Sequence, residues 1–558
     1  MKKYVHYFII LLIIAIFCLL FANHFTTVFT DRGREFLIPL EILKGSVPYK
    51  DINLIYFPLA FYINALIYKI LGVSINSLLY TQIALCSAFL IGYYILAKEF
   101  IKPKTALILT IFLIPVCIFA KNDLFGFLVP YSFSRFYGML SAFFCVFSII
   151  KLYKTDNIKF ACLASALAGF SLCSKIEFVT APVILLIGLL LYKKLPISQY
   201  LKIFASFLIF PIITISVLFL QGVSIQNISD AIKFGIEFSQ TDVITEFLSQ
   251  AGVYPLDLGQ KLKIAFGYIP IPVMIIILCF ITLKFKQKLP KLPILTLGIA
   301  IIYYLYYKKS TITEFWLILP LIMWFLLCFK AEYLYKNDRN LLFLIISSLL
   351  VAQREFFRLC LHFYGTYSFA LLILALVSYM YKFFPKKISD LKLEKLINYV
   401  FIVLIVFYTS NSWTARTDTR YTVATNKGTF YTKQKTAFVL NQTLDYIENN
   451  TDKNAKILVL PEGNIINFLT DRKVDMHCFM MDRLYHDAYG QYDAKNAIEN
   501  TKSDYIILVK GFDLQYFHKP YLFENDETPS AKYIHNNYTQ IAEFEKWNSS
   551  IQILKKNL

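Results

Sequence analysis

The sequence predicts an α-helical polytopic membrane protein with a small α/β domain at its C-terminal end. Its 558 residues are 57% hydrophobic with a mean hydropathy of +0.55, which lies well outside the composition of soluble domains. The apolar residues form repeated blocks of about 15 to 22, close to the roughly 20 that a helix needs to cross a bilayer. Strands of a membrane barrel would alternate in short segments, so the long blocks favour helices.

Polar breaks separate about thirteen apolar blocks, which predicts about thirteen transmembrane helices. Their centres lie near Leu12, Ala88, Leu113, Cys145, Ala166, Leu186, Phe207, Ile275, Ala300, Leu321, Ile345, Ile373 and Leu404. If the N-terminus is cytoplasmic, every second loop is rich in Lys or Arg, as in "AKEFIKPK" and "KFKQKLPK", and the positive-inside rule is met. We therefore expect an uncleaved first helix, a transmembrane domain over 1–410, and an external domain over 411–558.

The charge and the cysteines fit this interpretation. The formal net charge is +19, but most Lys and Arg residues lie in short loops between apolar blocks rather than on one basic face. Nucleic-acid binding is therefore not indicated, and the expected surrounding is the lipid bilayer. Nine of the ten cysteines lie in or beside apolar blocks, so no disulfide framework is indicated.

The tail has the pattern of a small α/β domain. Two short apolar runs bounded by turn residues, "AKILVLPEG" (455–463) and "SDYIILVKG" (503–511), predict buried strands. Apolar residues at helical spacing in "TKQKTAFVLNQTLDYIENN" predict a helix before the first of them. We expect this domain to pack on the external face of the membrane domain.

The first external loop, 24–77, carries many polar groups near the membrane boundary. Apolar residues at three-to-four spacing over 31–44, ended by Gly45, predict a short amphipathic helix lying along the membrane surface, with Thr30 or Asp31 as its cap. The following segment, 51–72, is apolar but broken by polar residues and proline, which indicates a second surface helix rather than a span.

The amino-acid sequence of this loop resembles that of a known enzyme class. Asp31-x-Gly-Arg34-Glu35, then "PLEILKGSVPYKD" and "YFPLAFYINALIYKILG", are similar to the first external loop of GT-C glycosyltransferases, in particular the protein O-mannosyltransferase and aminoarabinose lipid A transferase group. The resemblance implies a GT-C fold and transfer of a sugar from a polyprenyl-phosphate donor to an external acceptor with inversion. It also implies a bacterial inner membrane with an undecaprenyl-phosphate donor. Lipid A, a polysaccharide, a teichoic-type polymer or a protein all stay open as acceptors.

The resemblance also assigns roles to residues of the loop. Asp31 would be the general base, since a lipid phosphate is a good leaving group that needs little acid catalysis. Arg32 stands where many relatives have Glu, and Glu35 would supply that second acid. The remaining polar residues of the loop are assigned to substrate binding, and they are Arg34, Tyr49, Lys50, Asp51, Tyr56 and Asn64. The alternatives are that Asp31 is only a helix cap and that Arg34 and Glu35 form an exposed ion pair.

Fixed cations at the membrane edge would stabilise the departing phosphate. Besides Arg34, the candidates by position are Arg135, Lys175, Arg354 and Arg358. Lys175 and Glu177 stand between two apolar blocks with almost no loop, and a charge at membrane depth costs about 3 kcal/mol, so both are assigned to the site. The alternatives are a hairpin tip at the water boundary for Lys175 and a basic helix end for the two arginines.

The sequence implies no cofactor. The segment 475–493 gathers His, Cys and Asp residues, but its spacing matches no zinc signature, so a divalent metal is a minor alternative. Two rival functions stay open. A transporter or lipid flippase would also have many spans, although no internal repeat is visible and the charges gather at the external boundary. A non-catalytic subunit of envelope polysaccharide assembly would fit the departure at Arg32.

Overall fold

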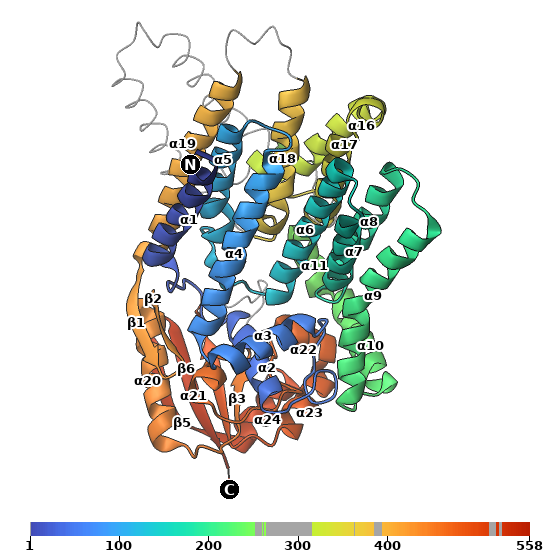
Figure 1. Ribbon diagram of the computed structural model, residues 1–558. Coiled ribbons are helices and arrows are strands. Elements are labelled where there is room, and N and C mark those ends of the chain that lie inside the picture. Colours follow the sequence, from blue (N-terminus) through green and yellow to red (C-terminus); the bar gives the residue numbers. More distant parts are fainter. Residues whose placement is uncertain are drawn as a thin grey trace, which may run out of the picture.

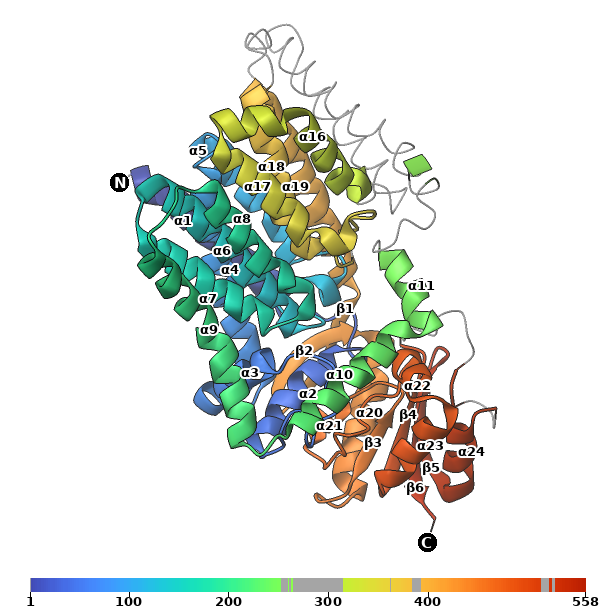
Figure 2. The same cartoon turned by 90° about the vertical axis from the view of Figure 1, so that its right-hand side faces the viewer.

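The computed structural model describes residues 2–251, 259, 262–263, 315–361, 363–383, 393–512, 521–523 and 527–557. Figures 1 and 2 show a bundle of roughly parallel helices at one end and a mixed domain of strands and helices at the other. The predicted span centres Ile275 and Ala300 lie outside the described residues.

The helical bundle contains all the other predicted span centres. Seven of its helices are long and apolar enough to cross a membrane, and five shorter apolar helices stand among them. The helices are α1 (Lys2–Phe21), α4 (Ile75–Ala97), α5 (Pro103–Leu113), α6 (Phe133–Thr155), α7 (Ile158–Leu172), α8 (Thr180–Leu191), α9 (Ile197–Leu220), α16 (Leu319–Asn337), α17 (Arg339–Val351), α18 (Thr366–Phe383) and α19 (Leu393–Thr417), with α3 (Leu59–Leu71) at one end. The predicted helical membrane fold with a C-terminal sheet is confirmed.

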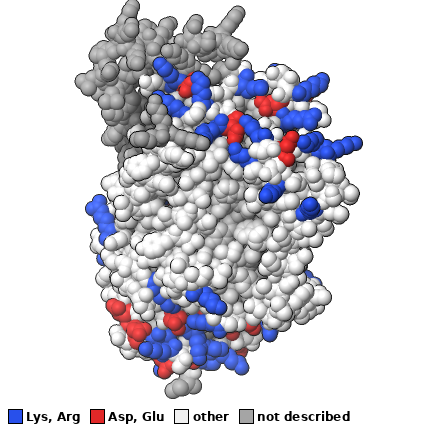
Figure 3. Space-filling model, viewed as in Figure 1, with Lys and Arg blue, Asp and Glu red and all other residues white. Residues whose placement is uncertain are grey.

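The surface of the bundle is apolar where it would meet lipid. Figure 3 shows a broad band almost free of charged atoms between two charged ends of the molecule. The outer helices expose large apolar side chains in this band, for example Leu19 on α1 and Leu220 on α9. An apolar belt of this kind is stable only in hydrocarbon.

The C-terminal domain is built on a four-stranded sheet in the order β3-β4-β6-β5. Strands β3 (Ile457–Leu460) and β4 (Tyr505–Lys510) are parallel, while β6 (Ser549–Lys556) pairs antiparallel with β4 and with β5 (Tyr538–Lys546). The predicted strands are thus confirmed as β3 and β4, and the predicted helix as α20 (Gln434–Asn450). A separate hairpin of β1 (Thr419–Thr425) and β2 (Gly428–Lys433) follows α19, and helices α21 (Ile465–Thr470), α22 (Arg483–Tyr489), α23 (Gln491–Asn500) and α24 (Pro529–Asn537) complete the domain.

Helix α2 (Arg32–Leu43) joins the bundle to this domain. The prediction of a helix here is confirmed, but the helix is not exposed as a surface helix would be, because the residues from Arg32 to Glu41 are buried. The helix packs on α21 and α3. Gly33 permits the close approach, since a Cβ atom there would lie 2.2 Å from the backbone nitrogen of Ile465. The C-terminal domain therefore covers the face that the sequence pattern left for solvent.

The long loop after α9 also reaches the C-terminal domain. It folds into α10 (Ile225–Gln240) and α11 (Asp242–Ala251), and a capping box at Ser224 starts α10. Phe234 of α10 contacts Tyr489 of α22 with ring centroids 4.8 Å apart. Together α2, α10 and α22 surround the space between bundle and domain (Figure 2).

Candidate active site

A cavity of about 1110 Å³ lies where the bundle, the first loop and the C-terminal domain meet. Its size is at the upper end of ordinary ligand pockets, which run to about 1,000 Å³. The first loop contributes Asp31, Arg34 and Tyr56 to its wall, the α7–α8 connection contributes Lys175, and the C-terminal domain contributes Asp482.

One wall of the cavity is apolar. It is formed by α9 and α10, and its large apolar side chains remain exposed to the cavity or to the outside, as Ile215, Phe219, Ile232 and Ile236 show. Helix α9 is also one of the helices that are long and apolar enough to cross a membrane.

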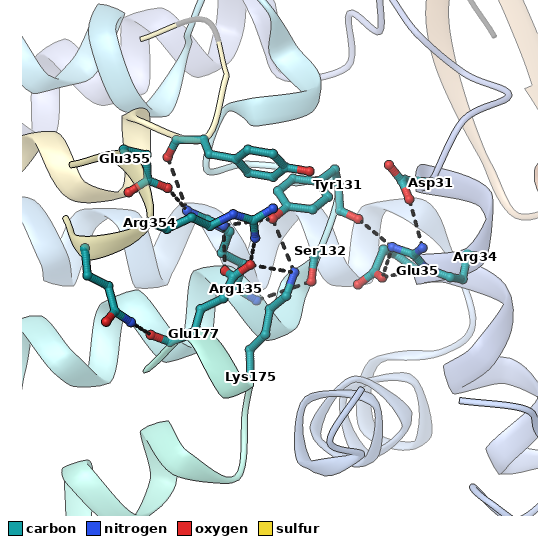
Figure 4. A network of polar contacts seen from close by, with 12 residues as sticks. Asp31, Arg34, Glu35, Tyr131, Ser132, Arg135, Lys175, Glu177, Arg354 and Glu355 are labelled. Atoms are coloured by element: carbon teal, nitrogen blue, oxygen red, sulfur yellow. Dashed lines mark hydrogen bonds and ion pairs between the residues drawn. The ribbon is translucent and has the colours of Figure 1, made fainter. Parts of the chain in front are cut away.

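A cationic cluster stands at the bundle side of the cavity (Figure 4). The guanidinium of Arg135 pairs with Glu177 and Glu355, and the guanidinium of Arg354 pairs with Glu177. The ammonium of Lys175 lies 4.0 Å from Glu177, which it shares with the two arginines. When Lys175 is protonated, the cations among these five described groups outnumber the carboxylates by one, so the cluster in that state is suited to receive an anion.

Lys175 is the member of the cluster whose charged form a bound anion would stabilise most. Burial lowers the pKa of Lys175 well below its ordinary value, and the nearby charges of Arg135 and Arg354 lower it further. Its Nζ donates to the hydroxyl of Tyr131 at 3.3 Å and lies 4.9 Å from the ring centre of Tyr56. An incoming phosphate would favour the charged ammonium and bind it directly.

The carboxylate of Asp31 stands apart from the cationic cluster (Figure 4). Asp31 occupies the N-cap position of α2 but makes no capping hydrogen bond with its side chain. Its Oδ1 instead lies 2.8 Å from Nη1 of Arg34, and its side chain keeps 31% exposure. The carboxylate is thus held by a cation and open to the cavity, which its alternative role as a cap would not provide.

Arg34 and Glu35 form a buried pair and not an exposed one. The side chains of Arg34 and Glu35 have 2% and 0% exposure, and Nη2 of Arg34 lies 3.1 Å from Oε1 of Glu35. The other carboxylate oxygen of Glu35 accepts a 2.7 Å hydrogen bond from the backbone of Phe133. Arg34 lines the cavity and Glu35 does not. Glu35 therefore orients Arg34. It does not line the cavity, where a second catalytic acid would have to stand.

Tyr131 connects the two charged parts of the site. Its backbone carbonyl accepts a 3.0 Å hydrogen bond from Arg34, and its hydroxyl accepts from Arg135 and Lys175 at 3.3 Å. Figure 4 shows the tyrosine between Asp31–Arg34 on one side and the cationic cluster on the other.

Arg32, which departs from the family pattern, is a structural residue. It is 1% exposed, pairs with Asp123 at 3.1 Å and donates to the carbonyl groups of Thr27 and Val129. It does not line the cavity.

The other predicted site residues fall into two groups. Tyr49, Tyr56, Glu177 and Arg354 line the cavity with Asp31, Arg34 and Lys175. The others lie outside its wall, and they are Lys50, Asp51, Asn64, Arg135 and Arg358.

Each of these outer residues has an identifiable contact. Asp51 accepts from the backbone of Val47, and Asn64 accepts from the hydroxyl of Tyr137 at 2.7 Å in the core. The backbone carbonyl of Lys50 contacts His477 of the C-terminal domain. The backbone nitrogen of Arg358 donates to the backbone carbonyl of Glu355. Arg135 forms ion pairs with the carboxylates of Glu177 and Glu355.

The sequence missed the carboxyl groups that the C-terminal domain contributes. Glu462 and Asp482 line the cavity, and burial raises the pKa of both. Glu462 lies near the end of the segment 455–463, which predicts a strand, and Asp482 lies in the segment 475–493, which was weighed as a metal site. The sequence of neither segment indicates that it lies near Asp31, because that distance depends on how the C-terminal domain docks on the bundle.

The segment 475–493 does not gather metal ligands. Within the part of the chain that the structure describes, no three His, Cys, Asp or Glu residues stand together as a metal site. His477 is exposed and contacts Asp475, whereas Cys478 is buried in the domain core.

Comparisons with known proteins give similar folds only. No model of a known protein family and no curated protein sequence matches the chain. The chain is similar to the oligosaccharyltransferase AglB from Archaeoglobus fulgidus in complex with an inhibitory peptide and a dolichol-phosphate, with 12% identity, coverage of 97% of this chain and 80% of that chain, and a TM-score of 0.48. It is also similar to an Archaeoglobus fulgidus oligosaccharyltransferase structure with Zn and sulfate, with 11% identity, coverage of 90% and 68%, and a TM-score of 0.45.

A third similar structure is ArnT from Cupriavidus metallidurans bound to undecaprenyl phosphate, with 8% identity, coverage of 99% of this chain and 98% of that chain, and a TM-score of 0.43. Because each of these TM-scores is below 0.5, the function proposed below rests on the geometry of the cavity.

Proposed function

We propose that the chain is an integral-membrane glycosyltransferase of the GT-C kind, which moves a sugar from a polyprenyl-phosphate donor to an acceptor and inverts the anomeric configuration. The observation that carries this proposal is a single cavity that combines an apolar wall, a cationic cluster and an open carboxylate. These three features match the lipid tail, the phosphate and the acceptor proton.

The donor enters along the apolar wall. The polyprenyl chain lies against α9 and α10, and its phosphate meets Lys175 and Arg354, which both line the cavity. Arg135 stabilises this arrangement from behind through Glu177 and Glu355. These cations are fixed by buried ion pairs before the reaction, so they stabilise the leaving phosphate without further reorganisation.

Asp31 acts on the acceptor as general base. Its carboxylate takes the proton of the acceptor O–H group while the acceptor oxygen forms a bond to the anomeric carbon. The bond between that carbon and the phosphate oxygen breaks, and its electron pair leaves with the polyprenyl phosphate. One in-line displacement inverts the anomeric configuration, and only one carboxylate base is required.

The charge pattern supports an orientation in the membrane. We place the N-terminus in the cytoplasm and the C-terminal domain outside a bacterial plasma membrane. The reason is that the described Lys-rich loop between α4 and α5 lies at the end of the bundle away from the C-terminal domain (Figure 1). The chain then comprises a transmembrane domain over 1–410 and an external domain over 411–558. No cofactor takes part in the proposed step.

Transfer of a radiolabelled sugar from extracted polyprenyl-linked lipid to membrane acceptors tests the function. Membranes that contain the wild-type protein should transfer label, and Asp31→Asn should reduce the rate by about 10²- to 10⁴-fold, the usual contribution of a general base. Binding of undecaprenyl phosphate should be unchanged, because Asp31 does not touch the donor phosphate.

Two outcomes would contradict the proposal. Equal transfer by the wild-type protein and a stably inserted Asp31→Asn variant would exclude Asp31 as the base. Movement of labelled lipid across proteoliposome membranes without any transfer of sugar would show the rival function, a transporter or flippase.

A further inference from the structure

Two carboxyl groups from the C-terminal domain face the cavity next to Asp31. The backbone nitrogen of Met481 donates to the carbonyl oxygen of Pro461 at 3.0 Å, and this contact places the next residue of each segment, Glu462 and Asp482, side by side. The two carboxyl groups are close enough for the charge of Asp482 to raise the pKa of Glu462. Both line the cavity, which the reaction assigned to Asp31 does not explain.

The environment of the pair favours a shared proton. Burial raises the pKa of Glu462 well above its ordinary value of 4.5, and the charge of Asp482 raises it further. The titratable groups that face the pair from the neighbouring elements include Asp31, Arg34 and Tyr56 of the first loop and Tyr485 of α22. A carboxyl pair that shares one proton can both donate and accept hydrogen bonds.

One buried oxygen of the pair receives no hydrogen bond from the described residues. Asp482 uses Oδ1 to accept a 2.9 Å hydrogen bond from the backbone of Tyr485, where it caps α22. Oε2 of Glu462 is buried and has no hydrogen-bond partner among the described residues. A buried, unpaired carboxyl oxygen costs free energy unless a bound group satisfies it.

The negative charge of this part of the cavity favours an alcohol acceptor over a phosphate acceptor. Asp31 and the pair bring two negative charges if the pair shares one proton, and Arg34 already divides its charge between Asp31 and Glu35. A phosphate acceptor would enter beside like charges, which is unfavourable in a partly buried site. An alcohol is uncharged, forms hydrogen bonds with both states of the pair, and needs the base that Asp31 supplies.

We propose that Glu462 and Asp482 form, with Asp31, an acceptor subsite that takes an alcohol hydroxyl and not a phosphate. This inference rests on the proposed function and narrows its acceptor. The alcohol oxygen binds the anomeric carbon, its proton passes to Asp31, and polyprenyl phosphate leaves, so the product is an O-glycoside. A phosphate acceptor would instead give a glycosyl phosphodiester.

The acid stability of the product tests the subsite. Membranes with the wild-type full-length protein receive label from extracted polyprenyl-linked lipid, the remaining donor is removed with organic solvent, and the product is treated with mild acid. Mild acid cleaves glycosyl phosphodiesters and leaves O-glycosides intact. We expect the transferred label to survive. Label released by mild acid would overturn the alcohol subsite and leave the proposed function standing, whereas absence of any transfer by the wild-type protein would overturn both.

Amide variants test the two residues themselves. Asp482→Asn keeps an oxygen that can cap α22, and Glu462→Gln keeps the shape of the side chain, so both variants should bind undecaprenyl phosphate as the wild type does. We expect each to raise the KM for the acceptor at least tenfold. Glu499→Gln, an exposed change on α23 of the same domain, is the matched control and should behave as wild type. An unchanged acceptor KM in both variants, with donor binding intact, would overturn the assignment.

Discussion

Replacement of Arg34 by methionine should destabilise the protein strongly, because it leaves a carboxylate buried without its cation. Arg34 is 2% exposed and lies 2.8 Å from Asp31 and 3.1 Å from Glu35. Glu35 is fully buried, so loss of Arg34 removes the charge that offsets its desolvation. Breaking a buried pair in this way costs about 3–5 kcal/mol, which is the loss expected in the free energy of unfolding.

A second substitution separates this effect from simple loss of packing. In Arg34→Met/Glu35→Gln the buried carboxylate is replaced by a neutral amide, whose oxygen can still accept the hydrogen bond from Phe133. We expect the double variant to recover about 2 kcal/mol of the loss, because the uncompensated charge is gone.

Equilibrium unfolding in mixed micelles with increasing dodecyl sulfate gives these free energies for the full-length protein. The reasoning is refuted if the double variant is as unstable as Arg34→Met, since the loss would then come from packing. It is also refuted if Arg34→Met unfolds like the wild type.

Three further predictions concern the donor cluster, the domain junction and the carboxyl pair. Lys175→Met should weaken binding of undecaprenyl phosphate about 10- to 100-fold, the value of a hydrogen bond to a charged group, as measured by titration in detergent; unchanged affinity would exclude Lys175 from the phosphate site. Gly33→Ala should lower the melting temperature because its Cβ atom would meet the backbone nitrogen of Ile465, whereas Gly235→Ala, with open space around it, should not. Because folded Glu462 keeps its proton above its ordinary pKa of 4.5 and the unfolded chain does not, the stability of the wild type relative to Glu462→Gln should fall as pH rises; a constant difference in melting temperature would contradict the raised pKa.

The helical bundle and the strands of the tail were predictable because their signals are local. A block of apolar residues long enough to cross a bilayer identifies α4 or α6 regardless of its neighbours, and a short apolar run between turn residues identifies β3 and β4. Helix α2 was predicted for the same reason, from its spacing and the glycine that follows it.

The burial of α2 was not predictable, because it depends on a partner more than 400 residues away in the chain. The pattern of Asp31 to Lys44 resembles that of a surface helix. Its burial depends on distant partners, because the helix packs on α21, and Arg34 and Glu35 bond to the backbone of Tyr131 and Phe133. The positions of Glu462 and Asp482 near Asp31 were not predictable for the same reason, because they depend on the docking of the C-terminal domain. Lys175 was found because a charge between two apolar blocks is informative by itself.

A structure of the full-length protein with undecaprenyl phosphate bound, determined by electron cryomicroscopy, tests the central claim most directly. The account predicts the phosphate within hydrogen-bonding distance of Lys175 and Arg354, the polyprenyl chain along α9 and α10, and Asp31 facing the space beyond the phosphate. A phosphate bound away from Lys175 and Arg354, with the cavity beside Asp31 closed to the lipid, would contradict it.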